Sequence, residues 1–363
     1  MTLLETGDRV TETLVVDRLL GEGAFAEVHR VRHEYLGWQA MKVFKRVASL
    51  AETRTLLEEA RLLSTLGHPN IVRVFDAGTV RTPKGVRGFF TMEYVAGGSL
   101  ERLIRAHAPT MPVALAVEAA EQIAAGLTAA HEQDPPILHR DLTLANILVG
   151  YDGSGLRVRI SDFGLAKRAD PFTMLASAQG TFAFMAPEVL RREGYSRASD
   201  VWSVGTIAYL LLTNRLPYDD GGPLSSYSPG RFARAPLPPS RYHPEVDPDL
   251  DRILLAALEI DPANRLASAG VLAAELRSRR QRLGAGAWPS PDGPAARPGA
   301  DAPAASPPSA RASRLAAEAL ELAQRAGQLG RAADLMEEAV NLSPDLRARY
   351  LPKLTLWRRG VTM

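Results

Sequence analysis

The 363-residue sequence has no cysteine and almost no excess charge of either sign. The absence of cysteine excludes a disulfide scaffold, a thiol nucleophile, cysteine-ligated zinc and iron–sulfur chemistry. Lysine and arginine number 43 against 41 aspartate and glutamate residues, and the resulting net charge of +2 is too small to indicate nucleic acid as the main partner. Any chemistry in this chain therefore depends on oxygen and nitrogen groups.

Long hydrophobic runs are also missing. The longest apolar stretch, Val201–Thr213, is interrupted by Ser203 and Gly205 and is shorter than the roughly 20 residues that a membrane-spanning helix needs. The N-terminal segment Met1–Val10 carries charged residues with no apolar run behind it, unlike a secretory signal. We therefore expect a cytoplasmic protein with no membrane span.

One segment differs sharply in composition from the rest of the chain. In residues 284–312, 24 of the 29 residues are Ala, Pro, Gly or Ser. Proline removes backbone donors and the small side chains supply no core, so we expect a disordered linker. It divides the chain into a body, residues 10–283, and a helical tail, residues 313–363.

The body begins with strand-like segments and continues with helical spacing. The predicted strands are 14–20, 28–33, 39–44, 71–77 and 89–95, and the predicted helices are 51–66, 115–132, 199–213 and 250–259. This order predicts an α+β fold in which a small β-rich lobe precedes a larger helical lobe, with a cleft between them.

The tail contains two helical patterns separated by a glycine. Ala332, Met336, Ala339 and Pro344 follow the spacing of the second helix of a tetratricopeptide repeat, whereas the first helix does not match that motif. The tail is therefore either a single tetratricopeptide-like unit or an amphipathic helical hairpin that docks on the body.

A glycine-rich segment, Leu20–Val28, lies between the first two predicted strands. Because Gly21 and Gly23 have no Cβ, the backbone N–H groups of such a loop can close over a polyphosphate. A tight hairpin uses the same residues, so this segment alone decides nothing. Lys42 follows on an apolar strand, on the same face as Ala40, although a strand lysine more often points to solvent.

A second segment, His139–Asn146, carries two oxygen-bearing side chains five residues apart. Asp141 could accept a proton from a hydroxyl group, and Asn146 could be an oxygen ligand of a divalent ion. Asp162 follows at the end of an apolar strand, before Gly164, and its carboxylate suits magnesium. Either segment alone could form an Asx-type turn, but both in this order and spacing favour phosphate chemistry.

Together these segments resemble the eukaryotic-like, Hanks-type bacterial serine/threonine protein kinases over residues 10–283. The matching residues, in chain order, are Gly21, Gly23, Lys42, Glu59, His139-Arg140-Asp141, Asn146, Asp162-Phe163-Gly164, Ala186-Pro187-Glu188, Asp200 and Arg265. The resemblance implies a bilobal kinase fold with a small antiparallel sheet and a large helical lobe, and it implies ATP and Mg²⁺ or Mn²⁺ as cofactors.

The resemblance also implies a role for each matching position. ATP would be bound by Leu20, Gly21, Glu22, Gly23, Ala24, Phe25, Ala26, Val28, Ala40, Lys42, Met92, Glu93, Val95 and Leu148. Lys42 would hold the phosphates and pair with Glu59, with Glu58 as the adjacent alternative. Asn146 and Asp162 would bind the metal, and Asp141 would orient the acceptor hydroxyl of a protein substrate.

Other matching positions would support the site. Glu188 and Arg265 would form a buried ion pair, Asp200 would brace the catalytic loop, and Thr181 would bond Asp141. In the family, the arginine at the position of Arg140 often receives an activation-loop phosphate, for which Thr173 and Ser177 are the candidate acceptors here.

The sequence departs from the family pattern at Thr143, where these kinases have a lysine beside the transferred phosphate, and at Ala26, the third loop glycine. We expect a working but slower serine/threonine kinase that autophosphorylates its activation loop. The alternative is a nucleotide-binding pseudokinase that recruits protein partners through its tail. A small-molecule phosphotransferase is disfavoured by Ala186-Pro187-Glu188, which belongs to the peptide-substrate platform of protein kinases.

Overall fold

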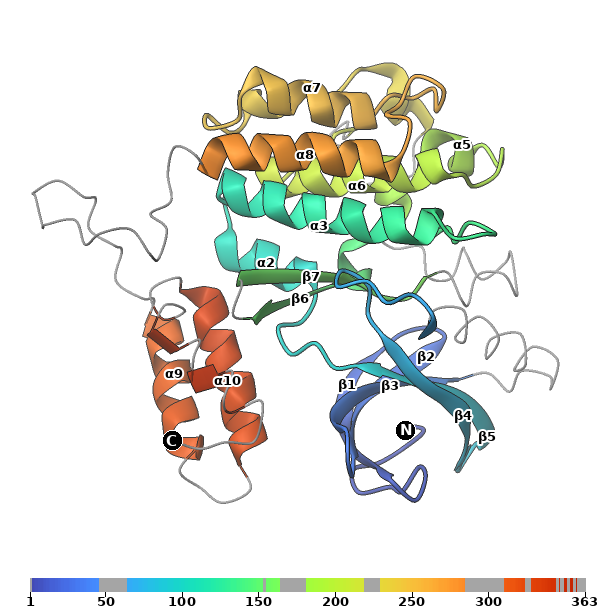
Figure 1. Cartoon of the computed structure of the whole chain (residues 1–363), viewed down its shortest axis with the longest axis vertical. Coiled ribbons are helices and arrows are strands. Elements are labelled where there is room, and N and C mark those ends of the chain that lie inside the picture. The colour runs from blue at the N-terminus through green and yellow to red at the C-terminus, as the bar shows by residue number, and fades with distance from the viewer. Residues whose placement is uncertain are drawn as a thin grey trace, which may run out of the picture.

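The computed structural model describes 2–45, 64–152, 155–163, 181–218, 229–284, 310–323 and 328–343, with six further residues near the C-terminus. Two lobes and a separate pair of helices are visible in Figure 1. The predicted α+β fold, in which a small antiparallel sheet precedes a larger helical lobe, is confirmed.

The N-terminal lobe is a five-stranded antiparallel sheet with the strand order β1-β2-β3-β5-β4. Its strands are β1 (Leu14–Glu22), β2 (Ala26–His33), β3 (Gly37–Phe44), β4 (Val74–Thr82) and β5 (Gly85–Glu93). The predicted strands at 14–20, 28–33 and 39–44 coincide with β1, β2 and β3.

Strand β3 lies between two cores. Met41 and Val43 point into the core of the N-terminal lobe, which also contains Leu3 from the N-terminal segment. Ala40 and Phe44 alternate with them and join the large core that continues into the C-terminal lobe. Because side chains alternate along a strand, β3 connects the two cores and places its second face toward the other lobe.

The predicted strand at 71–77 is wrong in its position, and the reason is that the two lobes divide this apolar run between them. Ile71 forms a parallel bridge with Ile160, and the Val72 N–H donates to the carbonyl of Ile160, so both residues belong to the C-terminal lobe. Strand β4 begins only at Val74, and its hairpin with β5 turns at Gly85, which has a φ of 100°.

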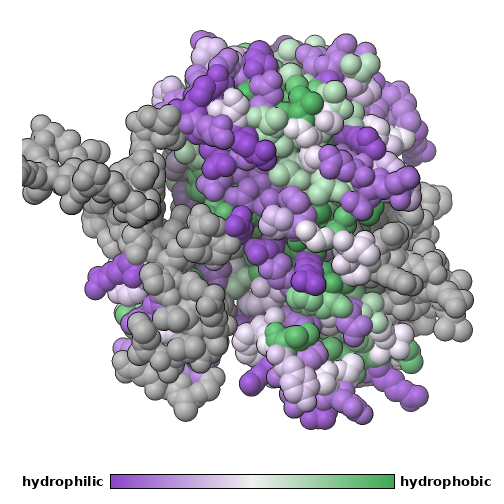
Figure 2. Space-filling model, in the orientation of Figure 1, coloured by the Kyte–Doolittle hydropathy of each residue, from purple (hydrophilic) through white to green (hydrophobic). Residues whose placement is uncertain are grey.

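Among its described residues the C-terminal lobe is helical apart from the small β6–β7 hairpin, and its long helices stack above that hairpin in Figure 1. It contains α2 (Leu100–His107), α3 (Val113–His131), β6 (Ile147–Asp152), β7 (Gly155–Ile160), α5 (Pro187–Leu190), α6 (Arg197–Thr213), α7 (Pro248–Ala257), α8 (Ala269–Gly284) and the 3-10 helices η1 (Leu144–Asn146), η2 (Thr181–Phe184), η4 (Pro229–Ala233) and η5 (Pro239–Arg241). Figure 2 shows hydrophilic side chains interspersed with smaller hydrophobic areas over this lobe.

Helix α3 is long and apolar enough to cross a membrane when judged by length and composition alone. It packs against α6, α8 and β7, and 61% of its apolar window is buried inside the lobe. Burial of this kind is what a core helix shows.

The tail forms an antiparallel pair of helices, α9 (Ala310–Ala323) and α10 (Leu329–Leu342), with a core of its own. Ala332, Met336 and Ala339, which carry the repeat-like spacing, are fully buried in that core. The tetratricopeptide likeness and the domain limits stay predictions.

Gly126 in α3 provides a test of how closely α3 packs against the segment before β4. An ideal Cβ at this position would lie 2.8 Å from the backbone oxygen of Asn70 and 3.0 Å from Cδ1 of Ile160. Alanine normally stabilises a helix interior relative to glycine by about 1 kcal/mol, but overpacking costs roughly 1–3 kcal/mol. We expect Gly126→Ala to lower the free energy of unfolding by about 1 kcal/mol or more, measured by urea denaturation.

The matched control is Gly67→Ala, because no heavy atom of the described residues lies within 4 Å of an ideal Cβ there. Its free energy of unfolding should stay close to that of the wild type. A Gly126→Ala protein that is as stable as the wild type, or more stable, would contradict the packing described here.

Candidate active site

The glycine-rich segment forms the hairpin between β1 and β2. The N–H of Gly23 donates to the carbonyl of Ala26 at 2.9 Å, which closes the turn. Neither packing nor backbone conformation explains the glycine at Gly21, because nothing among the described residues lies within 4 Å of an ideal Cβ and its φ is not positive. A side chain there would fill open space beside the hairpin, so the glycine leaves room for a ligand.

Six apolar residues from both lobes belong to the large core or pack against it. Val28 and Lys42 are cross-strand partners, as are Ala40 and Met92, so these side chains project from one face of the sheet. The six residues are Ala26, Val28, Ala40, Met92, Val95 and Leu148. The wall residues that the resemblance implies are therefore associated with one core, to which β6 of the other lobe contributes Leu148.

The connection between the lobes runs from Glu93 to Ser99. The backbone N–H of Glu93 donates to the carbonyl of Arg73 at 2.9 Å, so this group is already occupied within the protein. The Glu93 carboxylate pairs with Arg159 of β7, 2.9 Å away, and ties the connection to the C-terminal lobe.

An ion pair joins the two lobes across the cleft. Nζ of Lys42 lies 2.7 Å from Oδ1 of Asp162, and both side chains are largely shielded from solvent. Asp162 has a φ of 58°, a conformation that non-glycine residues rarely adopt. The predicted phosphate-binding lysine and the predicted metal-binding carboxylate are thus in direct contact.

The loop at 139–146 is held by the buried carboxylate of Asp200, in the first turn of α6. Its Oδ2 accepts from the backbone N–H of His139 at 2.8 Å, and its Oδ1 accepts from that of Arg140 at 3.1 Å. Nε2 of His131 lies 2.9 Å from the same carboxylate. Arg140 itself has a φ of 66°. The loop therefore takes its unusual backbone shape where Asp200 anchors it.

Asn146 links this loop to the strand end that carries Asp162. Its Nδ2 donates to the backbone carbonyl of Asp141 at 2.8 Å, and its own carbonyl accepts from the N–H of Ser161 at 2.8 Å. Since Ser161 directly precedes Asp162, these bonds fix the three oxygen-bearing residues relative to one another.

Burial keeps His139 neutral. The side chain is fully buried, its Nε2 lies 2.9 Å from the carbonyl oxygen of Ser161, and its ring contacts Phe163 at 4.8 Å. Burial lowers the pKa of His139, although the carboxylates around it act in the opposite direction. The neutral imidazole of His139 therefore packs between the loop 139–146 and residues 161–163 and helps to hold them together.

Tyr195 is a residue near the site that the sequence did not indicate. Burial raises the pKa of its hydroxyl to about 12, and the charges of Asp141 and Asp200 act in the same direction. His131 was missed in the same way. Both residues approach the loop only through tertiary folding, and neither belongs to a motif.

A second buried ion pair lies behind the loop. The guanidinium of Arg265 donates to both oxygens of Glu188, at 2.7 and 2.6 Å, and Ser199 donates to the same carboxylate. Burial is the largest single influence and acts to raise the pKa of Glu188, but the hydrogen bonds and charge of Arg265, a backbone hydrogen bond and the bond from Ser199 together hold the pKa below its ordinary value.

Some predicted residues lie outside the described residues: Glu59, Thr173 and Ser177. Thr181 begins η2, but its side chain is not among those described. The described residues place a cation, two carboxylates and an amide in one connected group, and Lys42 is the cross-strand partner of Val28 beside the glycine hairpin. Such a set can bind a polyphosphate with a divalent ion and can accept a proton from a hydroxyl group.

Comparison with known proteins gives a consistent answer. The protein kinase domain family matches residues 14–276. The serine/threonine-protein kinase PknB of Mycolicibacterium smegmatis is 32% identical over 75% of this chain and 44% of its own length. The serine/threonine-protein kinase Pkn1 of Myxococcus xanthus is 35% identical over 69% of this chain and 36% of its own length.

A solved structure shows the same fold. The crystal structure of the Mycobacterium tuberculosis PknI kinase domain matches 76% of this chain and 99% of its own length, with a TM-score of 0.57 and 26% identity. The chain spans less than half of the length of the curated relatives that it matches.

The Glu188–Arg265 pair should contribute strongly to stability. Glu188→Gln would leave the Arg265 guanidinium, whose side chain is fully buried, without its counter-charge. We expect a loss of about 3–5 kcal/mol in the free energy of unfolding at pH 7, measured by guanidinium denaturation. The difference from the wild type should shrink only as the pH falls below 4.5, the ordinary value for Glu188, because the pair needs the ionised carboxylate.

The matched control is Glu275→Gln. Glu275 pairs with Arg252 on the surface, with side chains 36% and 56% exposed, and such a pair contributes about 1 kcal/mol or less. Equal losses in the two variants would show that burial adds nothing to the Glu188–Arg265 pair.

Proposed function

The chain belongs to the protein kinase domain family, and from this premise we propose that it transfers the γ-phosphate of ATP to serine or threonine hydroxyls of proteins. The observation that carries the proposal is a connected set: Lys42 contacts Asp162 at 2.7 Å, and Asn146 bonds at 2.8 Å both to Asp141 and to Ser161, which directly precedes Asp162. The names of the similar proteins support serine and threonine as acceptors.

The N-terminal lobe would bind the nucleotide. The purine would lie between Val28 and Ala40 on one side and Leu148 on the other, with Met92, Glu93 and Val95 at its edge. The glycine hairpin, Leu20–Ala26, would cover the phosphates, and the open space beside Gly21 supports this assignment. Lys42 would neutralise the α- and β-phosphates.

The donors near the cleft fit a hard divalent cation. Nδ2 of Asn146 is occupied by the carbonyl of Asp141, so Oδ1 is the remaining polar atom of the amide, and Asp162 supplies a carboxylate. Oxygen donors of this kind suit Mg²⁺ or Mn²⁺. The ion would neutralise phosphate charge when it is bound with ATP. Asn146 and Asp162 would hold it.

Asp141 would accept the proton of the substrate hydroxyl as that oxygen attacks the γ-phosphorus. The hydrogen bond from Asn146 and the anchoring by Asp200 fix its backbone in this position. The guanidinium of Arg140 would bind the phosphate group of phosphorylated Thr173 or Ser177 in the activation loop. We place the reaction in the cytoplasm, where ATP is available.

If Asp141 accepts the proton of the substrate hydroxyl, its removal should strongly reduce the rate of phosphoryl transfer. Asp141→Asn keeps the shape of the side chain but cannot take up the proton, so the transfer of ³²P from ATP to the protein itself and to a basic protein substrate should fall at least about 100-fold. Nucleotide binding, measured with a fluorescent analogue, should be retained.

The control is Asp249→Asn, on exposed surface of α7, which should label like the wild type. Equal labelling of the wild type and Asp141→Asn would contradict the kinase assignment and favour a pseudokinase.

Phosphoamino-acid analysis of the labelled protein should give phosphoserine or phosphothreonine. Phosphotyrosine alone would contradict the proposed specificity.

Because Thr143 stands where similar kinases have a lysine, we expect a low kcat. Introducing a positive charge at this position should raise it. In similar kinases a lysine at this position stabilises charge on the transferred group. We expect Thr143→Lys to raise kcat about tenfold, with little change in KM for ATP. Thr143→Met has a similar length without the charge and should leave kcat unchanged. An equal gain in both variants would indicate a packing effect.

A further inference from the structure

Helix α10 of the tail contacts both lobes of the kinase fold. Asp334 reaches the N-terminal lobe, and Glu338, one helical turn later, reaches the C-terminal lobe. Residues four apart lie on the same face of a helix, so one face of α10 carries both contacts. Figure 1 shows the tail pair beside α2 and the β6–β7 hairpin.

The contact with the N-terminal lobe is partly buried and involves several groups. Oδ2 of Asp334 lies 2.5 Å from Nη1 of Arg30 and 2.9 Å from Nη2 of Arg18. The Arg30 side chain is only 5% exposed and its guanidinium lies over the ring of Trp38, 4.3 Å from the centroid. An ideal Cβ at Gly330 would lie 3.3 Å from Nε1 of Trp38, so the start of α10 also approaches the sheet closely.

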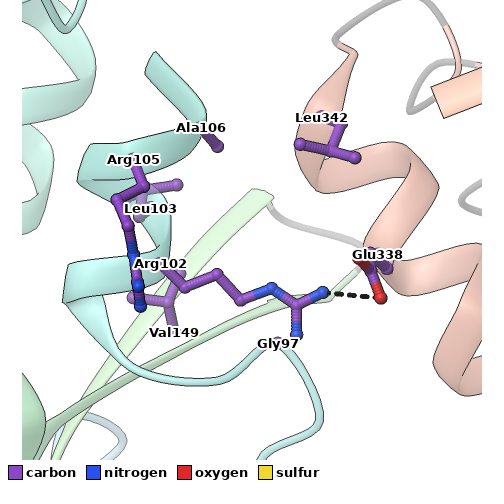
Figure 3. A pocket seen from close by; sticks show the side chains of 8 residues that line it. All are labelled: Gly97, Arg102, Leu103, Arg105, Ala106, Val149, Glu338 and Leu342. Atoms are coloured by element: carbon purple, nitrogen blue, oxygen red, sulfur yellow. Dashed lines mark ion pairs between the residues drawn. The ribbon is translucent and has the colours of Figure 1, made fainter. Parts of the chain in front are cut away.

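The contact with the C-terminal lobe is an ion pair on α2. Oε2 of Glu338 lies 2.9 Å from Nη2 of Arg102, as the dashed line in Figure 3 marks. Leu342 of α10 and Leu103 of α2 line the same cavity, together with Val149 of β6. This second anchor lies directly after the connection between the lobes, because α2 begins at Leu100.

The anchor on the sheet continues the face that lines the proposed nucleotide pocket. Arg30 is the cross-strand partner of Ala40 and follows Val28 by two residues, so all three side chains project from the same face of the sheet. The ring of Tyr94, in the connection itself, lies 5.5 Å from the guanidinium of Arg30. The tail thus spans the lobes alongside their covalent connection.

We propose that α10 is a strap between the lobes: Asp334 and Glu338 hold the arginines of the two lobes and restrict the hinge motion that opens the nucleotide cleft. Only the nucleotide measurement below rests on the proposed kinase function. With the strap in place the lobes keep a narrow range of separations, and its release widens that range and speeds nucleotide dissociation.

The packing of the tail suits a strap that can detach. The apolar residues of α9 and α10 are buried in a cluster of their own, so undocking does not open a core. A cavity of about 390 Å³ remains between α10 and α2. The Arg102–Glu338 pair lines this space, and the pairs of Asp334 lie on the other lobe, so the two sets of ion pairs can break separately, whereas a packed apolar interface could not.

The absence of cysteine allows a direct test with the full-length chain, because two introduced cysteines are the only labelling sites. Spin labels are attached at Tyr35→Cys, in the exposed β2–β3 turn, and at Val271→Cys, at an exposed position of α8. Double electron–electron resonance between them reports the distance between the lobes. Tyr35→Cys with Glu318→Cys reports docking of the tail. Each pair is compared with and without Asp334→Asn and Glu338→Gln together.

We expect the double variant to broaden both distance distributions and to speed dissociation of a fluorescent ATP analogue roughly threefold or more. Glu321→Gln, on the exposed side of α9, is the matched control and should change none of these measurements. Arg102→Glu alone should broaden the two distance distributions. Arg102→Glu together with Glu338→Arg exchanges the charges of the pair and should restore the distributions of the wild type.

Two results would overturn the proposal: a tail that stays docked in the double variant, or a tail that detaches while the distance between the lobes keeps its distribution. If the wild type binds no nucleotide, the kinase assignment fails, and the distance measurements still decide whether the strap exists.

Discussion

The candidate active site depends on one buried carboxylate, that of Asp200. It accepts hydrogen bonds from the backbone N–H groups of His139 and Arg140, which are drawn toward the core just before Asp141. Without an acceptor these groups would be left unsatisfied away from water, which costs about 1–3 kcal/mol for each. Because Asp200 lies in α6, which is buried along most of its length, the position of the loop follows from the packing of that helix.

The second constraint is that the site is divided between two bodies. Lys42 belongs to a sheet whose register fixes it opposite Val28, whereas Asp162 lies two residues after the end of β7, in the other lobe. Their 2.7 Å ion pair crosses the cleft. The N-terminal lobe has one core of its own, and a larger core runs from the sheet into the C-terminal lobe. The geometry of the site therefore depends on the relative position of the two lobes. A contact that fixes the relative position of the lobes therefore also fixes the position of Lys42 relative to Asp162.

The sequence predicts best the features that are local. The loop 139–146 and the segment around Asp162 carry their chemistry within a few residues, and β1 and β2 are visible as short β-like runs on either side of a glycine-rich segment. The run at 71–77 was placed wrongly because its first residues pair with β7, a partner nearly ninety residues away in the chain. Periodicity cannot show which of two lobes an apolar residue will join.

Long-range contacts escape the sequence for the same reason. His131 and Tyr195 reach the loop through folding alone, and no spacing rule connects either residue with Asp141 or Asp200. The contacts of Asp334 with Arg30 and Arg18 are the extreme cases, at sequence separations of 304 and 316 residues. The near-zero net charge of the chain hides them, because total charge says nothing about which acid meets which base.

Such separations are no obstacle to these contacts, because the entropy of closing a loop grows only slowly with its length. What matters is that Asp334 and Glu338 bind different lobes. A helix held by one lobe would only be tethered, whereas a helix held by both makes the separation of the lobes part of its own binding equilibrium. By thermodynamic linkage, a ligand that favours closed lobes then favours the docked tail, and a protein that captures the tail weakens the hold on that ligand to the same degree.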